Sequence, residues 1–170
     1  GLWQLGPARL VLERTAGEWR LSHTAGTDPL DETYAVELPT ECSLEGKLLR
    51  FPWATDEGQV RVEPILLDRS VVSRPLDPII LVPGADVTVF MSTPVMLRVR
   101  VGEGLTELAE LTSLQGSRTW LGANTRSGEL CHSTRTHAQI DLDAVRFRPA
   151  RAVTRARISN HSDERVTVER

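Results

Sequence analysis

The stretch Ile79-Ile-Leu-Val-Pro-Gly-Ala-Asp-Val-Thr-Val-Phe-Met-Ser-Thr-Pro-Val-Met-Leu-Arg-Val-Arg-Val101 decides the fold class. Near its end, one face of an extended chain carries only apolar side chains, namely Val95, Leu97, Val99 and Val101. This alternation is the period of a half-buried strand. Turn signals at Pro83-Gly84 and Thr93-Pro94 divide the stretch into segments of about eight to ten residues. The pattern predicts an all-β fold, antiparallel, with two packed sheets in a jelly-roll or immunoglobulin-like β-sandwich.

Strand-like segments continue on both sides of this stretch. Near the start, Glu18–His23 alternates apolar with polar residues, and near the end Arg151–Asn160 alternates small apolar residues with arginines. Only Leu105–Leu111 has helical spacing, with a leucine every third residue, so we expect there at most one short helix of one or two turns, or an irregular connection. No repeat or linker composition interrupts the chain, and 170 residues can bury one core. We therefore expect a single β-sandwich domain over residues 1–170.

The net charge of −3 is divided unevenly along the chain. Residues 1–117 carry 10 basic and 17 acidic side chains, a net of −7, whereas residues 118–170 carry 10 and 6, a net of +4. Every basic residue except Lys47 is arginine, which pairs bidentately with carboxylates, so we expect the two portions to neutralise each other. A nucleic-acid-binding domain usually has a strongly basic pI, whereas here it is about 5.8. We expect no nucleic-acid partner.

The lengths of the apolar runs and the number of cysteines indicate in which cellular compartment the protein is located. The apolar runs are no longer than about five residues, so the sequence predicts no transmembrane segment. Two cysteines, Cys42 and Cys131, are too few for a disulfide framework, and we expect both to be buried, reduced thiols. Reduced thiols, and a start without a signal-peptide pattern, favour a cytoplasmic location.

The densest polar run of the chain is Ser117–Asp141, which we predict to be a hairpin. Thr119–Gly122 should end the first strand, because Gly122–Gly128 supplies turn residues, and Glu129–Ile140 should return antiparallel. This arrangement places Arg118 opposite Ser133 or Arg135 and Asn124 at the tip. The candidate ligand-binding residues all come from this hairpin: Trp120, Asn124, Glu129, Arg118 and Arg135.

The same hairpin holds residues of catalytic type, but their spacing argues against a catalytic or metal site. Glu129, Cys131 and His137 would share one strand face, yet Arg135 stands between them and would repel a cation. His132 follows Cys131 directly and faces the other way, so it cannot serve as the base for that thiol. We expect no catalytic residue, metal or cofactor. We expect Cys131 to pack in the core and Glu129 to pair with Arg118 or Arg135.

Tryptophan is the commonest large aromatic residue here. Trp3, Trp19, Trp53 and Trp120 compare with one tyrosine and three phenylalanines. Core packing is the ordinary role of a tryptophan, and Trp120, between Arg118 and Asn124, is the strongest exception. An exposed Trp120 could stack on a sugar or another flat ligand.

An ordered set of short motifs resembles a known family. The motifs are Glu18-Trp19-Arg20, Ser73-Arg74-Pro75, Ser92-Thr93-Pro94, Thr119-Trp120-Leu121-Gly122, Gly128-Glu129-Leu130-Cys131 and Arg151-Ala152-Val153-Thr154. Together they resemble an uncharacterised prokaryotic family, domain of unknown function 432. The chain departs from its pattern at His132, where an aromatic is usual, and at Arg155, where a proline is usual. The resemblance implies no activity and carries over no catalytic residue. The family's genes occur near those of small mechanosensitive channels, which implies association only.

Three functions are therefore considered. We expect a soluble, non-enzymatic module that binds an unknown small ligand or protein partner. The first alternative is an enzyme acting on small molecules or glycans, with a pocket near Trp120 and Glu129. The second is a regulatory partner of a membrane channel, which rests on the resemblance alone. A carboxylate with a raised pKa in a cleft would favour the enzyme, and an apolar groove would favour binding.

Overall fold

The computed structural model describes residues 1–39, 43–53 and 58–169. Within these residues the secondary structure is β-strand, apart from one 3-10 turn, η1 (Leu142–Ala144). The predicted all-β class is confirmed. No helix in the described ranges is long and apolar enough to cross a membrane.

The strands form two compact units, and each unit is assembled from three separate segments of chain. Unit 1 comprises Gly1–Leu66, Val95–Gln115 and Arg148–Ala150. Unit 2 comprises Leu67–Pro94, Gly116–Phe147 and Arg151–Arg170.

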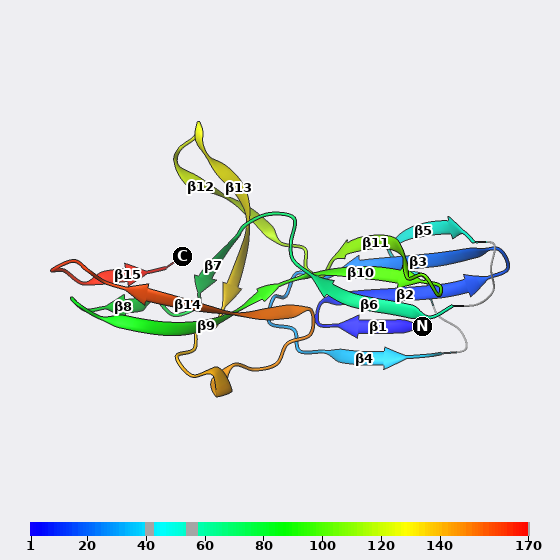
Figure 1. Ribbon diagram of the computed structural model, residues 1–170, viewed down its shortest axis with the longest axis horizontal. Helices are drawn as coiled ribbons and strands as arrows, with labels where there is room; N and C mark the ends of the chain where they lie inside the picture. Colours follow the sequence, from blue (N-terminus) through cyan, green and yellow to red (C-terminus); the bar gives the residue numbers. More distant parts are fainter. Residues whose placement is uncertain (40–42, 54–57, 170) are drawn as a thin grey trace. The chain divides into compact units, whose positions relative to one another are not determined.

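Unit 1 contains two sheets (Figure 1). The first has the order β4-β1-β2-β3-β5, from β1 (Leu2–Leu5), β2 (Ala8–Thr15), β3 (Glu18–Ala25), β4 (Tyr34–Glu37) and β5 (Lys47–Pro52). The second has the order β11-β10-β6, from β6 (Val60–Ile65), β10 (Met96–Val101) and β11 (Thr106–Thr112). All of these neighbours pair antiparallel.

The two sheets of unit 1 share one apolar core. Its buried side chains come from β2, β3, β10 and β11: Ala8, Leu10, Leu12, Leu21, Leu97, Val99, Val101 and Leu111. The alternation read in Val95–Val101 is therefore confirmed, because Val95, Leu97, Val99 and Val101 are all buried. Trp3, Trp19 and Trp53 are partly buried and pack against this core, which is the role expected of most tryptophans here.

The prediction of a short helix or an irregular connection over Leu105–Leu111 is wrong, because Thr106–Thr112 is strand β11. The register with β10 shifts between Val99 and Arg100, so that Leu108 is the extra residue of a β-bulge. A bulge changes which side chains point inward, and here it leaves inward leucines three residues apart. That spacing imitates one face of a helix.

The described strands of unit 2 form one three-stranded and two two-stranded sheets. One has the order β12-β13-β7, from β7 (Val71–Pro75), β12 (Ser117–Asn124) and β13 (Ser127–Thr136). A long antiparallel pair joins β9 (Asp86–Pro94) to β14 (Arg151–Ser159), and a short one joins β8 (Ile79–Leu81) to β15 (Val166–Val168). Arg157 of β14 pairs with Asp86 of β9, so part of the predicted charge neutralisation between the two portions is present.

One pairing in unit 2 departs from the antiparallel expectation. Strand β13 runs parallel to β7, with His132 beside Val71 and Thr136 beside Pro75. A parallel pair requires a long connection between its strands, and no local turn signal marks it. The sequence could predict the hairpin β12–β13 but not the strand on its other side.

Candidate functional site

The predicted hairpin is strands β12 and β13, joined by a tight turn. The antiparallel register runs from Ser117 beside Ser133 to Asn124 beside Ser127. Arg118 lies beside His132, one residue from Ser133 and three from Arg135, the two partners expected from the sequence. In Figure 1 this two-stranded ribbon extends past the beginning of β7, and among the described strands β7 pairs with β13 only from His132 to Thr136.

Asn124 lies at the tip, as predicted, and its side chain closes the turn. Its Oδ1 accepts hydrogen bonds from the backbone N–H groups of Arg126 and Ser127, each at 2.9 Å. Its carbonyl oxygen accepts a hydrogen bond from Nε1 of Trp120 at 2.9 Å. A Cβ added at Gly128 would lie 2.8 Å from that Nε1, so glycine lets the indole lie across the ribbon. The Asn124 side-chain oxygen therefore has a structural partner already.

Trp120 is the exposed exception among the tryptophans. Its side chain is 45% exposed, whereas Trp3, Trp19 and Trp53 pack against the core of unit 1. Leu121 and Leu130 beside it are also exposed. Trp120 thus presents an aromatic face on the ribbon.

The five candidate residues do not form one site. Trp120 lies beside Leu130, the residue after Glu129, and strand side chains alternate, so Trp120 and Glu129 occupy opposite faces of the ribbon. Arg118 shares the face of Trp120. Arg135 shares the face of Glu129 but lies about 20 Å further along the strand.

Cys131 is a buried free thiol. Its Sγ lies 3.5 Å from Oε1 of Glu129, and burial, together with this carboxylate, raises the pKa of the thiol. A raised pKa lowers the thiolate fraction at neutral pH and works against a nucleophilic role. Glu129 has no arginine partner among the described residues, so its expected pairing with Arg118 or Arg135 is wrong. Cys42 lies outside the described residues.

His132 anchors the hairpin to the segment that precedes β7. Its Nε2 lies 2.7 Å from Oδ1 of Asp68, and its backbone N–H donates to the carbonyl of Ser70 at 2.9 Å. The histidine holds the pKa of the Asp68 carboxyl below its usual range. In the described ranges, no three His, Cys, Asp or Glu side chains are grouped so that they could hold a metal ion.

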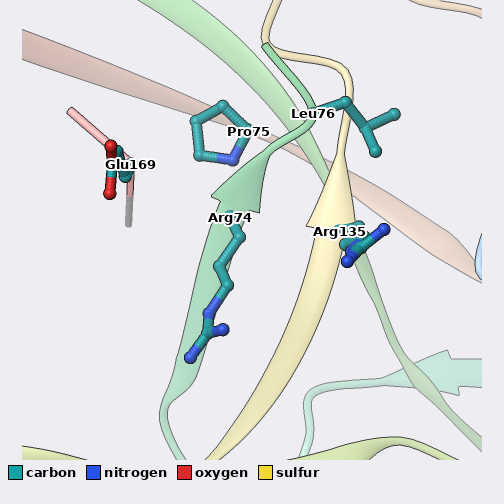
Figure 2. A pocket seen from close by; sticks show the side chains of 5 residues that line it. All are labelled: Arg74, Pro75, Leu76, Arg135 and Glu169. Carbon is teal, nitrogen blue, oxygen red and sulfur yellow. The ribbon is translucent and has the colours of Figure 1, made fainter. Parts of the chain in front are cut away.

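Two hollows in the described part of unit 2 each receive one side chain from this hairpin. The first has a volume of about 530 Å³, and its lining includes Val71, Val72, Met91, Thr93, Leu121 and Thr154. The second has a volume of about 400 Å³ and is lined by Arg74, Pro75, Leu76, Arg135 and Glu169 (Figure 2).

Of the five candidate residues, Arg135 alone lines either of these two hollows, and its neighbour there is Arg74. The signal for Arg74 in the sequence is weak and consists of its place in the Ser73-Arg74-Pro75 motif. It could not place Arg74 beside Arg135, because that placement depends on the parallel pairing of β7 with β13.

The family comparison agrees with the motif resemblance. A family model described as Protein of unknown function (DUF432) matches residues 2–170. The chain belongs to this family. No curated protein and no solved structure matches this DUF432 chain.

The exposure of Trp120 predicts a small effect of its removal on stability. Trp120→Ala should lower the free energy of unfolding by about 1 kcal/mol or less, because little apolar surface leaves a buried site. Trp19→Ala, at the core of unit 1, should cost about 3 kcal/mol or more. Denaturant unfolding of both variants measures the difference. A loss above about 3 kcal/mol for Trp120→Ala would contradict an exposed indole.

The burial of Cys131 predicts slow thiol chemistry. In a Cys42→Ser background, the native protein at neutral pH should react slowly with a disulfide reagent and reach one equivalent only after denaturation. The pKa of Cys131 is raised, so the native rate should still be rising with pH above the usual range of a thiol. Rapid labelling of the native protein at neutral pH would revive the nucleophile hypothesis.

Proposed function

We propose that this protein is a non-enzymatic binding module whose ligand occupies the larger hollow of unit 2. The observation that carries the proposal is the hollow itself. Its volume of about 530 Å³ lies within the range of about 300–1,000 Å³ that small-molecule sites occupy. Strands β7, β9, β12 and β14 all contribute to its lining, so the hairpin completes a site built on three other strands.

The lining favours a mainly apolar ligand with few hydrogen bonds. Val71, Met91 and Leu121 supply apolar surface, and the hydroxyl groups of Thr93 and Thr154 supply polar contacts. Leu121 is 49% exposed, so covering it would remove apolar area from water, which contributes about 25 cal/mol per Å². A few polar groups around an apolar lining are typical of sites that orient a ligand.

Two observations favour binding over the enzyme alternative. Trp120 and Glu129 lie on opposite faces of the ribbon, and neither lines a described hollow, so they make a poor shared pocket. The raised pKa of Cys131 keeps that thiol protonated at neutral pH. A protonated, buried thiol also suits a reducing compartment, so we propose a cytoplasmic location.

We also propose that residues 1–170 fold as one domain of β-sandwich type. Unit 1 supports the sandwich, because its two sheets share a core. The chain passes repeatedly from one unit to the other, so neither unit is a continuous piece of sequence. Discontinuous units of this kind favour joint folding.

The uncharged dye N-phenyl-1-naphthylamine provides the test, because its fluorescence rises in apolar surroundings. The wild-type protein should give saturable enhancement. Thr154→Trp should weaken dye affinity by about tenfold or more, because the indole would fill the hollow. The matched control is Val153→Trp, on the opposite face of β14, which should leave affinity unchanged. Absence of saturable enhancement, or an equal loss in both variants, would contradict the proposed site.

A further inference from the structure

Eight arginines form ion pairs with carboxylates in the described part of the chain, and Arg74 and Arg135 are not among them. The ion pairs join Arg9 to Glu45, Arg20 to Glu13 and Glu18, Arg50 to Glu18, Arg69 to Asp68, Arg98 to Glu107 and Glu110, Arg100 to Glu63, Arg148 to Glu32, and Arg157 to Asp86. Arg74 and Arg135 have no ion pair with any described residue. Other described arginines also lack an ion pair but line neither of these two hollows, namely Arg61, Arg118, Arg126, Arg155 and Arg165.

The parallel register places Arg74 and Arg135, both without an ion pair, side by side on adjacent strands. Arg135 and Arg74 are direct neighbours on β13 and β7, and direct neighbours in a sheet project to the same face. Figure 2 shows the two side chains on adjacent strands, both lining the hollow of about 400 Å³. The side-chain contact made by Arg74 is a long hydrogen bond of 3.4 Å to Oγ1 of Thr119.

This arrangement destabilises the empty protein and favours a bound anion. Like charges directly beside each other on a sheet repel, and the strands lie only about 5 Å apart. A carboxylate can accept hydrogen bonds from two guanidinium groups at once, and such charge-assisted bonds are among the strongest in proteins. Binding a carboxylate would therefore replace a repulsion with two attractions.

The remaining lining residues indicate which carboxylate fits. Glu169 lines the same hollow and has no cationic partner among the described residues, so it can accept bonds from an ammonium group. In Figure 2 it lies beside Pro75, on the opposite side of β7 from Arg135. Pro75 and Leu76 add apolar surface. A simple dianion would be repelled by Glu169, whereas a zwitterion satisfies both signs of charge.

We propose that this hollow binds a small zwitterion of the amino-acid type. Arg74 and Arg135 hold its carboxylate, Glu169 holds its ammonium group, and Pro75 and Leu76 contact an apolar side chain. The site shares no lining residue with the larger hollow, so it stands independently of the function proposed above.

Isothermal titration calorimetry with three matched probes tests the ligand class. The probes are leucine, 4-methylpentanoate, which lacks the amino group, and 3-methylbutylamine, which lacks the carboxylate. Leucine should bind saturably, and each of the other two should bind about tenfold or more weakly, since each leaves one charged group of the site without a partner. Inorganic phosphate should bind more weakly than leucine, because Glu169 repels it.

Variants assign the roles within the site. Arg135→Gln and Arg74→Gln should each weaken leucine binding about tenfold or more, without lowering the thermal stability of the ligand-free protein, because each removes a like-charge repulsion. Glu169→Gln should weaken leucine binding and leave 4-methylpentanoate unaffected or bound more tightly. The matched control, Arg155→Gln, should change neither.

Four results would overturn the proposal. They are no saturable leucine binding, leucine binding no tighter than 4-methylpentanoate, phosphate binding tighter than leucine, and an Arg155→Gln effect equal to that of Arg135→Gln. The third result would assign the arginine pair to an anion site of another class. None of the four bears on dye binding in the larger hollow, so the two proposals fail separately.

Discussion

The parallel pairing of β7 with β13 is the interaction on which the organisation of unit 2 depends. It makes β13 a central strand, hydrogen-bonded to β12 on one side and to β7 on the other. The backbone N–H of His132 donates to the carbonyl of Ser70, and that of Leu76 donates to the carbonyl of Thr136, each at 2.9 Å. Thr136 is fully buried, and its Oγ1 accepts a hydrogen bond from the N–H of Ser92 on β9. The half of β13 nearer Thr136 is thereby held by hydrogen bonds to β7 and β9.

This pairing also explains where binding surfaces arise. Strand β7 contributes Val71 and Val72 to the apolar hollow and Arg74 and Pro75 to the charged one. The hairpin meets these residues with Leu121 and Arg135, one from each of its strands. Both candidate sites therefore depend on β7, a strand that is distant from the hairpin in sequence and adjacent to it only in the folded protein. The exposed aromatic surface of the hairpin itself faces elsewhere.

The sequence predicted what short-range patterns determine. Alternation in Val95–Val101 identified a strand of the core, and the glycines with Asn124 identified the hairpin turn. Prediction from the sequence failed where a feature depends on residues that are distant in the chain. The bulge at Leu108 imitated a helical period, and the neighbour of Arg135 is a residue 61 positions earlier in the chain, Arg74. In the polar run Ser117–Asp141, two residues of reactive or ligand-binding type have structural roles: Asn124 closes the turn, and Cys131 is buried. Residue type alone could not distinguish these roles from ligand binding.

The most direct test of this account is nuclear magnetic resonance of backbone protons in β7 and β13. The account predicts nuclear Overhauser contacts between Val71–Pro75 and His132–Thr136 in the parallel register, with His132 near Val71 and Arg135 near Arg74. It also predicts slow hydrogen exchange at the amides of His132 and Leu76, whose hydrogen bonds close this pairing. Contacts in an antiparallel or shifted register, or rapid exchange at both amides, would contradict the placement of Arg74 beside Arg135.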